Sequence, residues 1–403
     1  MSTFESASRL RERWPTEVLV ARAGIVLGLF AFVVALPSVS GHFSFPPTAR
    51  QPWWPAVIGV CAIAAGIWAV SRGVRRPGWT AVGFGIIGIA LGVLATRAGE
   101  GNLNQVVVWS ALLSSTLVWA TPLTFAAIGG MFCERSGVVN IGLEGMMLAG
   151  AFFGALGADK LGSWELGLVS AAVAGGAFAL VHAVMAIHLR ADQIVSGTAI
   201  NFLALGVTGY FFIQIYGTNG TPGNLPRIPD VNIGFLGSVF GHLSLMIWLS
   251  FVLLIVAHIT LFKTAIGLRI RSVGEHPRAA DTVGISVYGT RYAAVVLSGM
   301  LAALGGAYLS IGYLGSFSEN MTAGRGFIAL AAVIFGNWRP FGAFAAALLF
   351  GGSTALSFRL AQPWGNASVL FQALPYVLTL IAVAGVIGRS VPPAAAGRPY
   401  VKQ

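Results

Sequence analysis

The sequence predicts an all-α membrane protein that crosses the bilayer ten to twelve times. Only 9% of its 403 residues are charged and 56% are hydrophobic, whereas a soluble fold of this size needs more charge on its surface. The apolar residues form continuous runs of roughly 17 to 25 residues without period-two alternation, which is the length of a membrane-spanning helix. Because lipid offers the backbone no hydrogen-bond partners, such runs are expected to be helices.

The apolar runs define the expected elements in order. They lie at residues 23–39, 53–70, 79–96, 106–130, 141–158, 166–188, 194–216, 244–262, 291–314, 322–338, 341–360 and 368–388. The first run is too long for the core of a signal peptide and no cleavage site follows it, so we expect a retained span. Very short breaks follow 106–130 and 322–338. At each break the two flanking runs are either separate spans or one broken or re-entrant segment.

Basic residues predict the orientation of the spans, because cytoplasmic loops carry an excess of Lys and Arg. If the N-terminus lies inside and twelve spans follow, eighteen of the 24 basic residues fall inside and six fall outside. We therefore expect both termini in the cytoplasm. The formal net charge of +11 then reflects scattered loop cations, which predict contact with anionic lipid and no binding of nucleic acid.

Several chemistries lack the residues that they require. Cys61 and Cys133 lie in or beside apolar runs and the six histidines show no metal spacing, so neither a disulfide framework nor a metal site is expected. The three lysines follow Asp159, Phe262 and Val401, so there is no P-loop, and neither GxSxG nor HExxH occurs. We expect a transporter without an enzyme site, powered by an ion gradient or by a separate subunit.

The first polar segment within the apolar background is Phe125–Met147. It places four polar side chains between two apolar runs: Glu134, Arg135, Asn140 and Glu144. Gly137, Gly142 and Gly145 are expected to interrupt the helix. One interpretation is a broken helix that lines a solute cavity, with Glu144 as an ionisable group at membrane depth. The other is a tight interfacial turn in which Glu134 and Arg135 form a pair among the headgroups.

The second polar segment is the long inner loop 263–291. Gly274 and Pro277 are expected to open a short helix that ends at Gly284, and Ser286 to cap the helix that follows. The small apolar face of the short helix consists of Ala279, Ala280 and Val283. This compact elbow either docks into a groove on a partner or is an ordinary connecting loop.

These segments resemble the permease subunits of ABC importers in the branched-chain amino acid and ribose superfamily, nearest to the nucleoside-importer branch. The resemblance is carried by Glu134-Arg-Ser-Gly-Val-Val-Asn-Ile-Gly-Leu-Glu-Gly-Met-Met147, Asp192-Gln-Ile-Val-Ser-Gly-Thr-Ala-Ile-Asn201, Gly274-Glu-His-Pro-Arg-Ala-Ala-Asp-Thr-Val-Gly-Ile285 and Gly326-Phe-Ile-Ala-Leu-Ala-Ala-Val-Ile-Phe-Gly336. It covers about residues 106–388. Residues 1–105 are interpreted as an N-terminal addition with about three spans, and 389–403 as a disordered cytoplasmic tail.

The resemblance implies a bacterial cytoplasmic membrane protein that couples to a separate cytoplasmic ATPase. The implied coupling elbow consists of Gly274, Glu275, Pro277, Arg278, Ala279, Ala280, Asp281 and Gly284. No cofactor is expected in this chain, because the partner ATPase uses ATP and Mg. The other implied partners are membrane lipid, a second related permease, and an extracytoplasmic substrate-binding lipoprotein that faces the Gly- and Pro-rich loop 217–243.

The resemblance also implies a core of two related halves. Residues 125–158 and 326–360 both consist of an apolar run, a short polar break and a second apolar run. Paired breaks indicate a solute path. The candidate path residues for a nucleoside or related polar solute are Asn140, Glu144, Asn201 and Asn337. Alternatively these side chains satisfy one another across packed helices. The competing function is an ion-driven secondary carrier of twelve spans, in which Glu144 would be the one candidate ion relay and the elbow would have no role.

Overall fold

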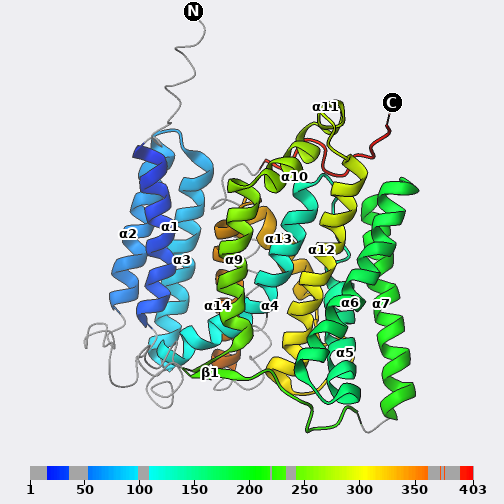
Figure 1. Ribbon diagram of the computed structural model, residues 1–403. Helices are drawn as coiled ribbons and strands as arrows, with labels where there is room; N and C mark the ends of the chain where they lie inside the picture. Colours follow the sequence, from blue (N-terminus) through cyan, green and yellow to red (C-terminus); the bar gives the residue numbers. More distant parts are fainter. Residues whose placement is uncertain are drawn as a thin grey trace, which may run out of the picture. The chain divides into compact units, whose positions relative to one another are not determined.

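The computed structural model is almost entirely helical over the residues that it describes (Figure 1). These residues are 16–35, 53–98, 109–217, 220–232, 242–361, 373, 376 and 391–402. The chain divides into two compact units. The first joins Met1–Leu112 to Leu356–Gly388, and the second joins Leu113–Ala355 to Arg389–Gln403. The second unit therefore groups the C-terminal residues with the core, whereas their composition predicted a separate tail.

Three of the described helices lie wholly within the first unit: α1 (Thr16–Ala35), α2 (Trp53–Ser71) and α3 (Arg75–Ala98). All three pack on one another. Glycines allow the close approach of α2 and α3, because a Cβ on Gly66 would lie 2.6 Å from the carbonyl oxygen of Gly78. This is the small-residue packing typical of membrane helices.

The remaining described helices lie wholly or mostly in the second unit. Their bounds are α4 (Trp109–Arg135), α5 (Leu143–Leu161), α6 (Trp164–Ala183), α7 (Gln193–Tyr216), α9 (Leu245–Lys263), α10 (Ala265–Glu275), α11 (Pro277–Thr282), α12 (Val287–Ala307), α13 (Arg325–Phe335) and α14 (Pro340–Ala361). Helices α6 and α12 continue as π-helical segments, Val184–His188 and Tyr308–Leu314. Helix α5 lies centrally, with α6, α7, α12 and α13 packed around it.

The all-α membrane fold is confirmed. Each predicted apolar run up to residue 360 coincides with a helix, and the run 368–388 lies outside the described residues. Within the described residues, six helices are long and apolar enough to cross a membrane. They are Ala111–Arg135, Trp164–His188, Gln193–Tyr216, Leu245–Lys263, Val287–Leu314 and Pro340–Arg359. The total of ten to twelve spans and the internal two-fold repeat stay predictions.

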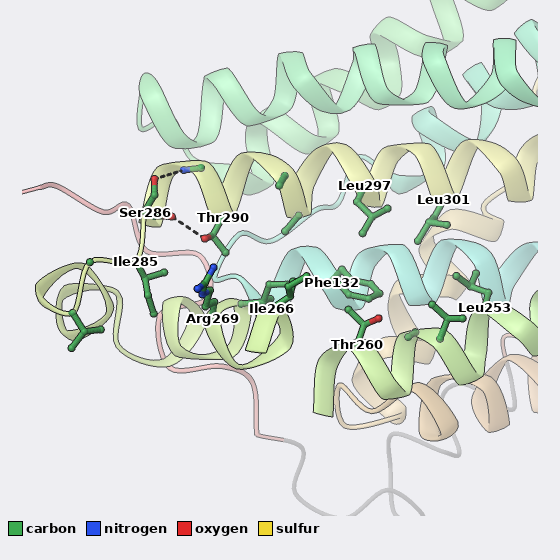
Figure 2. A pocket seen from close by; sticks show the side chains of 18 residues that line it. Phe132, Leu253, Thr260, Ile266, Arg269, Ile285, Ser286, Thr290, Leu297 and Leu301 are labelled. Atoms are coloured by element: carbon green, nitrogen blue, oxygen red, sulfur yellow. Dashed lines mark hydrogen bonds between the residues drawn. The ribbon is translucent and has the colours of Figure 1, made fainter. Parts of the chain in front are cut away.

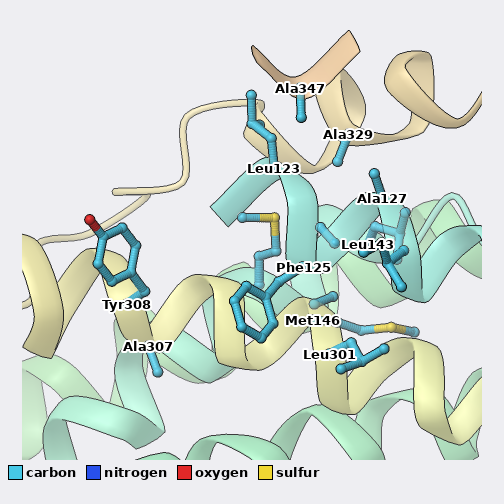
Figure 3. Close-up of a cluster of buried hydrophobic side chains, with 14 of the residues drawn as sticks. Leu123, Phe125, Ala127, Leu143, Met146, Leu301, Ala307, Tyr308, Ala329 and Ala347 are labelled. Atoms are coloured by element: carbon cyan, nitrogen blue, oxygen red, sulfur yellow. The ribbon is translucent and has the colours of Figure 1, made fainter. Parts of the chain in front are cut away.

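The core of the second unit brings together helices that are far apart in the sequence. Figure 3 shows Leu123, Phe125 and Ala127 of α4 beside Leu143 and Met146 of α5. The same cluster receives side chains from α12, the π-helical segment after it, α13 and α14, namely Leu301, Ala307, Tyr308, Ala329 and Ala347. Small residues alternate with large ones, so the helices approach closely and still leave the large side chains room to interdigitate.

Both predicted breaks are present, between α4 and α5 and between α13 and α14. Gly137 turns the first break with a φ of +91°, a value that favours glycine. Asn337 and Trp338 turn the second break with φ of 52° and 51°. Gly145 was expected to interrupt the helix and instead lies inside α5, where its lack of a side chain lets the backbone of Asn201 approach.

The Gly- and Pro-rich loop after α7 contains a short antiparallel pair of strands in its described part. Strand β1 (Asp230–Asn232) pairs with β2 (His242–Ser244), so that Val231 lies opposite Leu243. The described part of the loop is bonded to the π-helical segment that follows α12, because Ile228 N donates to the carbonyl of Ile311 over 3.1 Å. The residues of this loop around Ile228 are therefore packed against the protein.

The C-terminal residues differ from the disordered tail that the composition suggested. Residues 391–402 lie along α10 and α11, where Figure 1 shows them as a red trace. Pro393, Ala395 and Tyr400 are buried while their neighbours are mostly exposed. The apolar side chains of this segment thus pack against the protein and its polar ones face outward.

Candidate functional site

The first helix break, residues 136–142, is held by side chains from three other helices. Buried backbone groups need partners, and here α6, α7 and α12 supply them. The pairs are Ser136 O with Arg291 Nε (3.2 Å), Val139 N with Gln193 Oε1 (2.7 Å), Val139 O with His182 Nε2 (3.1 Å) and Ile141 O with Asn201 Nδ2 (3.1 Å). The break therefore has a fixed shape.

Trp338 joins the first break to the second. Its indole Nε1–H donates to the buried carboxylate of Glu134, and its carbonyl oxygen accepts from Nε and Nη2 of Arg135 at 3.0 and 2.9 Å. Glu134 and Arg135 thus both bind the second break, and the alternative of a solvated pair between the two is not what the structure shows. The two breaks lie side by side although 203 residues separate Arg135 from Trp338 in the sequence.

We expect Trp338→Phe to lower the stability of the protein. The phenyl ring fills most of the indole site but leaves the Glu134 carboxylate, which is 4% exposed, without its donor. An unsatisfied buried acceptor of this kind costs about 1–3 kcal/mol. The thermal unfolding midpoint of the purified protein measures the loss. Trp79→Phe is the matched control, because Trp79 is 63% exposed, and equal midpoints for both variants would contradict the prediction.

Glu144 binds the start of α13 and not an open cavity. One carboxylate oxygen accepts from Thr322 Oγ1 at 2.6 Å and from Gly324 N at 2.8 Å, and the other accepts from Gly326 N at 2.6 Å. A negative charge at a helix N-terminus is favourable, because the first backbone N–H groups there lack partners. Glu144 is only 8% exposed, so its charge is compensated within the protein.

The amide side chains of Asn201 and Asn140 are also engaged inside the protein. Asn201 Oδ1 accepts from Gly145 N at 2.8 Å and so caps the first turn of α5. Asn140 Nδ2 donates to Ser298 Oγ at 3.0 Å, and its Oδ1 is buried without a hydrogen-bond partner among the described residues. Of the two amides, only Asn140 retains an unused polar atom.

Asn337 lies in the second break, where its Oδ1 accepts from Val391 N at 3.3 Å. The structure therefore brings all four predicted path residues to the two breaks. Each makes hydrogen bonds within the protein, which is the alternative that the sequence left open. Contact between these side chains and a solute stays a prediction.

The predicted elbow consists of the end of α10, all of α11 and the connection to α12. Pro277 begins α11, Gly284 ends it with a φ of +83°, and Ser286 Oγ caps α12 by accepting from Gly289 N at 3.2 Å. Gly274 is buried against the first break, because a Cβ there would overlap the carbonyl oxygen of Arg135. The elbow and the broken helix are thus in direct backbone contact.

The apolar face expected on α11 is divided between two sides. Ala280 is 3% exposed and packs inward with Val273, Val287 and Tyr400, whereas Val283 is 73% exposed. Asp281 is half-buried beside Tyr400, and Glu275 accepts from Ala394 N at 3.1 Å. The outward face available to a partner consists of Arg278, Ala279, Thr282 and Val283.

A cavity of about 760 Å³ opens beside the elbow. Figure 2 shows Arg269, Ser286 and Thr290 at one end and Leu297 and Leu301 farther along. Its walls come from α4, α9, α10, the α11–α12 connection and α12. Because residues 283–286 form one wall, a movement of the elbow changes the shape of this cavity. The predicted path residues do not line it.

Several residues of this site were not among the sequence candidates, namely His182, Gln193, Arg291, Ser298, Thr322 and Trp338. His182 and Arg291 are fully buried polar groups within or at the start of apolar runs, which is a recognisable signal in a membrane protein. Trp338 lies in the second break but carries no charge. Its carbonyl oxygen binds Arg135 and its indole binds Glu134, so both its backbone and its side chain contribute. Such a role leaves little trace in the sequence.

A family model described as the permease component of the branched-chain amino acid transport system matches residues 112–383. The chain belongs to this family. It is therefore a multi-pass membrane component of a transport system, and the elbow and the paired helix breaks lie within the matched range. No solved structure matches the chain.

Three named proteins are similar to this chain over most of their own length. The guanosine ABC transporter permease NupQ of Bacillus subtilis is 45% identical over 322 residues, 74% of this chain and 99% of NupQ. The nucleoside ABC transporter permease NupC of Lactococcus lactis is 42% identical over 316 residues, 74% of this chain and 99% of NupC. A second guanosine ABC transporter permease of B. subtilis, NupP, is 23% identical over 66% of this chain and 82% of NupP.

Proposed function

We propose that this chain is the permease of an ATP-driven importer that carries a nucleoside or a related small polar solute. The proposal is carried by the 45% identity to a permease named for guanosine, which extends over 99% of that relative. A nucleoside offers hydroxyl groups and a base edge, for which neutral amides are suitable partners. Among the described path residues, the buried Oδ1 of Asn140 is an amide oxygen without a hydrogen-bond partner in the protein.

The contacts of the elbow support coupling to a separate ATPase. Gly274 lies against the Arg135 carbonyl, and Arg135 holds Trp338 of the second break. A displacement of the elbow would thus reach both breaks through packed backbone, without a flexible link between them. Transmission of this kind needs a stiff element whose position a partner can change.

The complete transporter would contain further chains. B. subtilis has two guanosine permeases, NupQ and NupP, which resemble this chain to different degrees, and this supports a pore built with a second, non-identical permease. We also propose a substrate-binding lipoprotein outside the cell and a bacterial cytoplasmic membrane with both termini inside. ATP and Mg would be used by the ATPase. The outward residues of α11 would then face the cytoplasm.

We expect Val283→Asp to remove the ATPase from the purified complex. Val283 is an exposed apolar residue on the outward face of α11, and a buried charge at an interface weakens association about tenfold or more. The measurement is the amount of ATPase that co-purifies with a tagged permease. Leu161→Asp is the control, because Leu161 is 56% exposed at the far end of α5. Undiminished co-purification with Val283→Asp would count against the elbow as the docking site.

The competing function, an ion-driven carrier, makes the opposite prediction for reconstituted vesicles. A carrier would accumulate guanosine when only a proton or sodium gradient is supplied. The importer requires ATP, the ATPase and the binding protein, and it accumulates nothing with an ion gradient alone. Parallel measurements with guanosine, a pyrimidine nucleoside and a hexose would then define the class of solute.

A further inference from the structure

The C-terminal segment, residues 391–402, is hydrogen-bonded to the elbow through its backbone. Ala395 N donates to the carbonyl of Gly274 at 2.9 Å, and Ala394 N donates to the Glu275 carboxylate at 3.1 Å. These bonds bind the end of α10, immediately before the short helix α11. The segment therefore holds the part of the elbow that lies against the first break.

The same segment also contacts both helix breaks. Gly397 N donates to the carbonyl of Gly137 at 3.2 Å, and Val391 N donates to Asn337 Oδ1 at 3.3 Å. Gly397 adopts a φ of +75°, so the turn that presents its N–H suits glycine. Within one stretch of twelve residues the chain thus binds the elbow, the first break and the second break.

Tyr400 anchors the end of this segment. The residue is 6% exposed and packs with Val273, Ala280 and Val287, and its carbonyl oxygen accepts from Tyr288 Oη at 3.3 Å. Burial raises the pKa of Tyr400, and its hydrogen bond to Asp281 raises the pKa further. The hydroxyl therefore stays protonated as a donor to that carboxylate.

Helix α11 needs such an anchor because six residues are too few for a stable isolated helix. Its buried residue is Ala280, whose small methyl group offers little apolar surface. The ring of Tyr400 supplies the large side chain of this cluster. Without this ring, Val273 and Val287 would be the remaining buried side chains that pack against Ala280 in this cluster.

We propose that residues 391–402 are a strap that fixes the elbow to the two helix breaks, with Tyr400 as a positioning residue for coupling. The proposal rests on the proposed function, since it assumes that a partner ATPase moves the elbow. With the strap in place, a displacement of α11 also moves Gly137 and Asn337, to which the strap is hydrogen-bonded. Without it, part of that displacement is lost in local motion of the elbow.

The test compares Tyr400→Ala, Tyr400→Phe and Gly397→Pro in the complete reconstituted transporter. We expect Tyr400→Ala and Gly397→Pro to consume about tenfold more ATP per guanosine imported, with unchanged ATPase co-purification, because coupling energies are typically of this size. Tyr400→Phe keeps the ring and should stay near the original ratio. Lys402→Ala, at an exposed position of the segment, is the control.

Amide hydrogen exchange in the purified permease tests the strap without the ATPase. Exchange in residues 276–290 should rise about tenfold in Tyr400→Ala and Gly397→Pro, because local opening becomes easier. If exchange rises in both variants but the unmodified complex does not couple ATP hydrolysis to import, the proposed function is wrong. The inference that residues 391–402 fix the elbow is then still supported. Unchanged exchange together with an unchanged ATP-to-guanosine ratio in both variants would overturn the strap. Because Gly397 is exposed, we expect Gly397→Pro to fold. This variant therefore tests the strap even if Tyr400→Ala does not fold.

Discussion

Glu144→Ala is expected to abolish import by destabilising the start of α13. The substitution removes the acceptor of three hydrogen bonds, from Thr322, Gly324 and Gly326. Leaving these donors unpaired in a buried site costs on the order of 3 kcal/mol or more. The thermal unfolding midpoint of the purified protein should fall strongly, and import of guanosine should be lost with it.

Glu144→Gln distinguishes this role from direct solute binding. Glutamine keeps one oxygen acceptor but turns an amide toward backbone donors, so its stability should lie between those of the original protein and Glu144→Ala. A residue that acts only as a solute ligand would behave differently. In that case Glu144→Ala would keep the original unfolding midpoint and lose solute binding alone, which would contradict the assignment made here.

Gly274→Ala is expected to disconnect the elbow from the first break. The added Cβ would overlap the carbonyl oxygen of Arg135, which belongs to backbone and cannot rotate away. Overpacking of this kind costs about 1–3 kcal/mol and shifts the backbone. We expect the ATPase to bind still, since the outward face of α11 is unchanged, while guanosine-stimulated ATP hydrolysis and import fall about tenfold.

Gly206→Ala provides the matched control for this glycine substitution. Gly206 lies inside α7, where an added Cβ meets no atom within 4 Å. Alanine is there the better helix former, so this variant should be at least as stable as the original protein. If both variants import guanosine at the original rate, the contact between Gly274 and Arg135 has no part in coupling.

The positions of the described helices, and most of the turns that join them, could be predicted from the sequence. Runs of apolar residues located the helices because lipid leaves the backbone no alternative. Local chemistry located the elbow: Pro277 can begin a helix, Gly284 can adopt a positive φ, and Ser286 can cap a helix. Each of these features depends on neighbours only a few residues away.

What the sequence could not supply was the pairing of distant groups. Glu144 finds its partners about 180 residues away, and a carboxylate gives no sign of whether it will meet a solute or a helix end. The inward position of Ala280 was equally hidden, since a six-residue helix is too short to show a periodic pattern. For Tyr400, the Pro- and Ala-rich surroundings indicated disorder and concealed one buried aromatic ring.

The fastening of the two helix breaks to each other limits how a passage can open. Glu144 and Trp338 join the early and late portions of the core through hydrogen bonds of buried residues. Sliding these portions apart in every transport cycle would expose several unpaired polar groups each time. We therefore expect the helices that these bonds join to move together as one rigid body during transport.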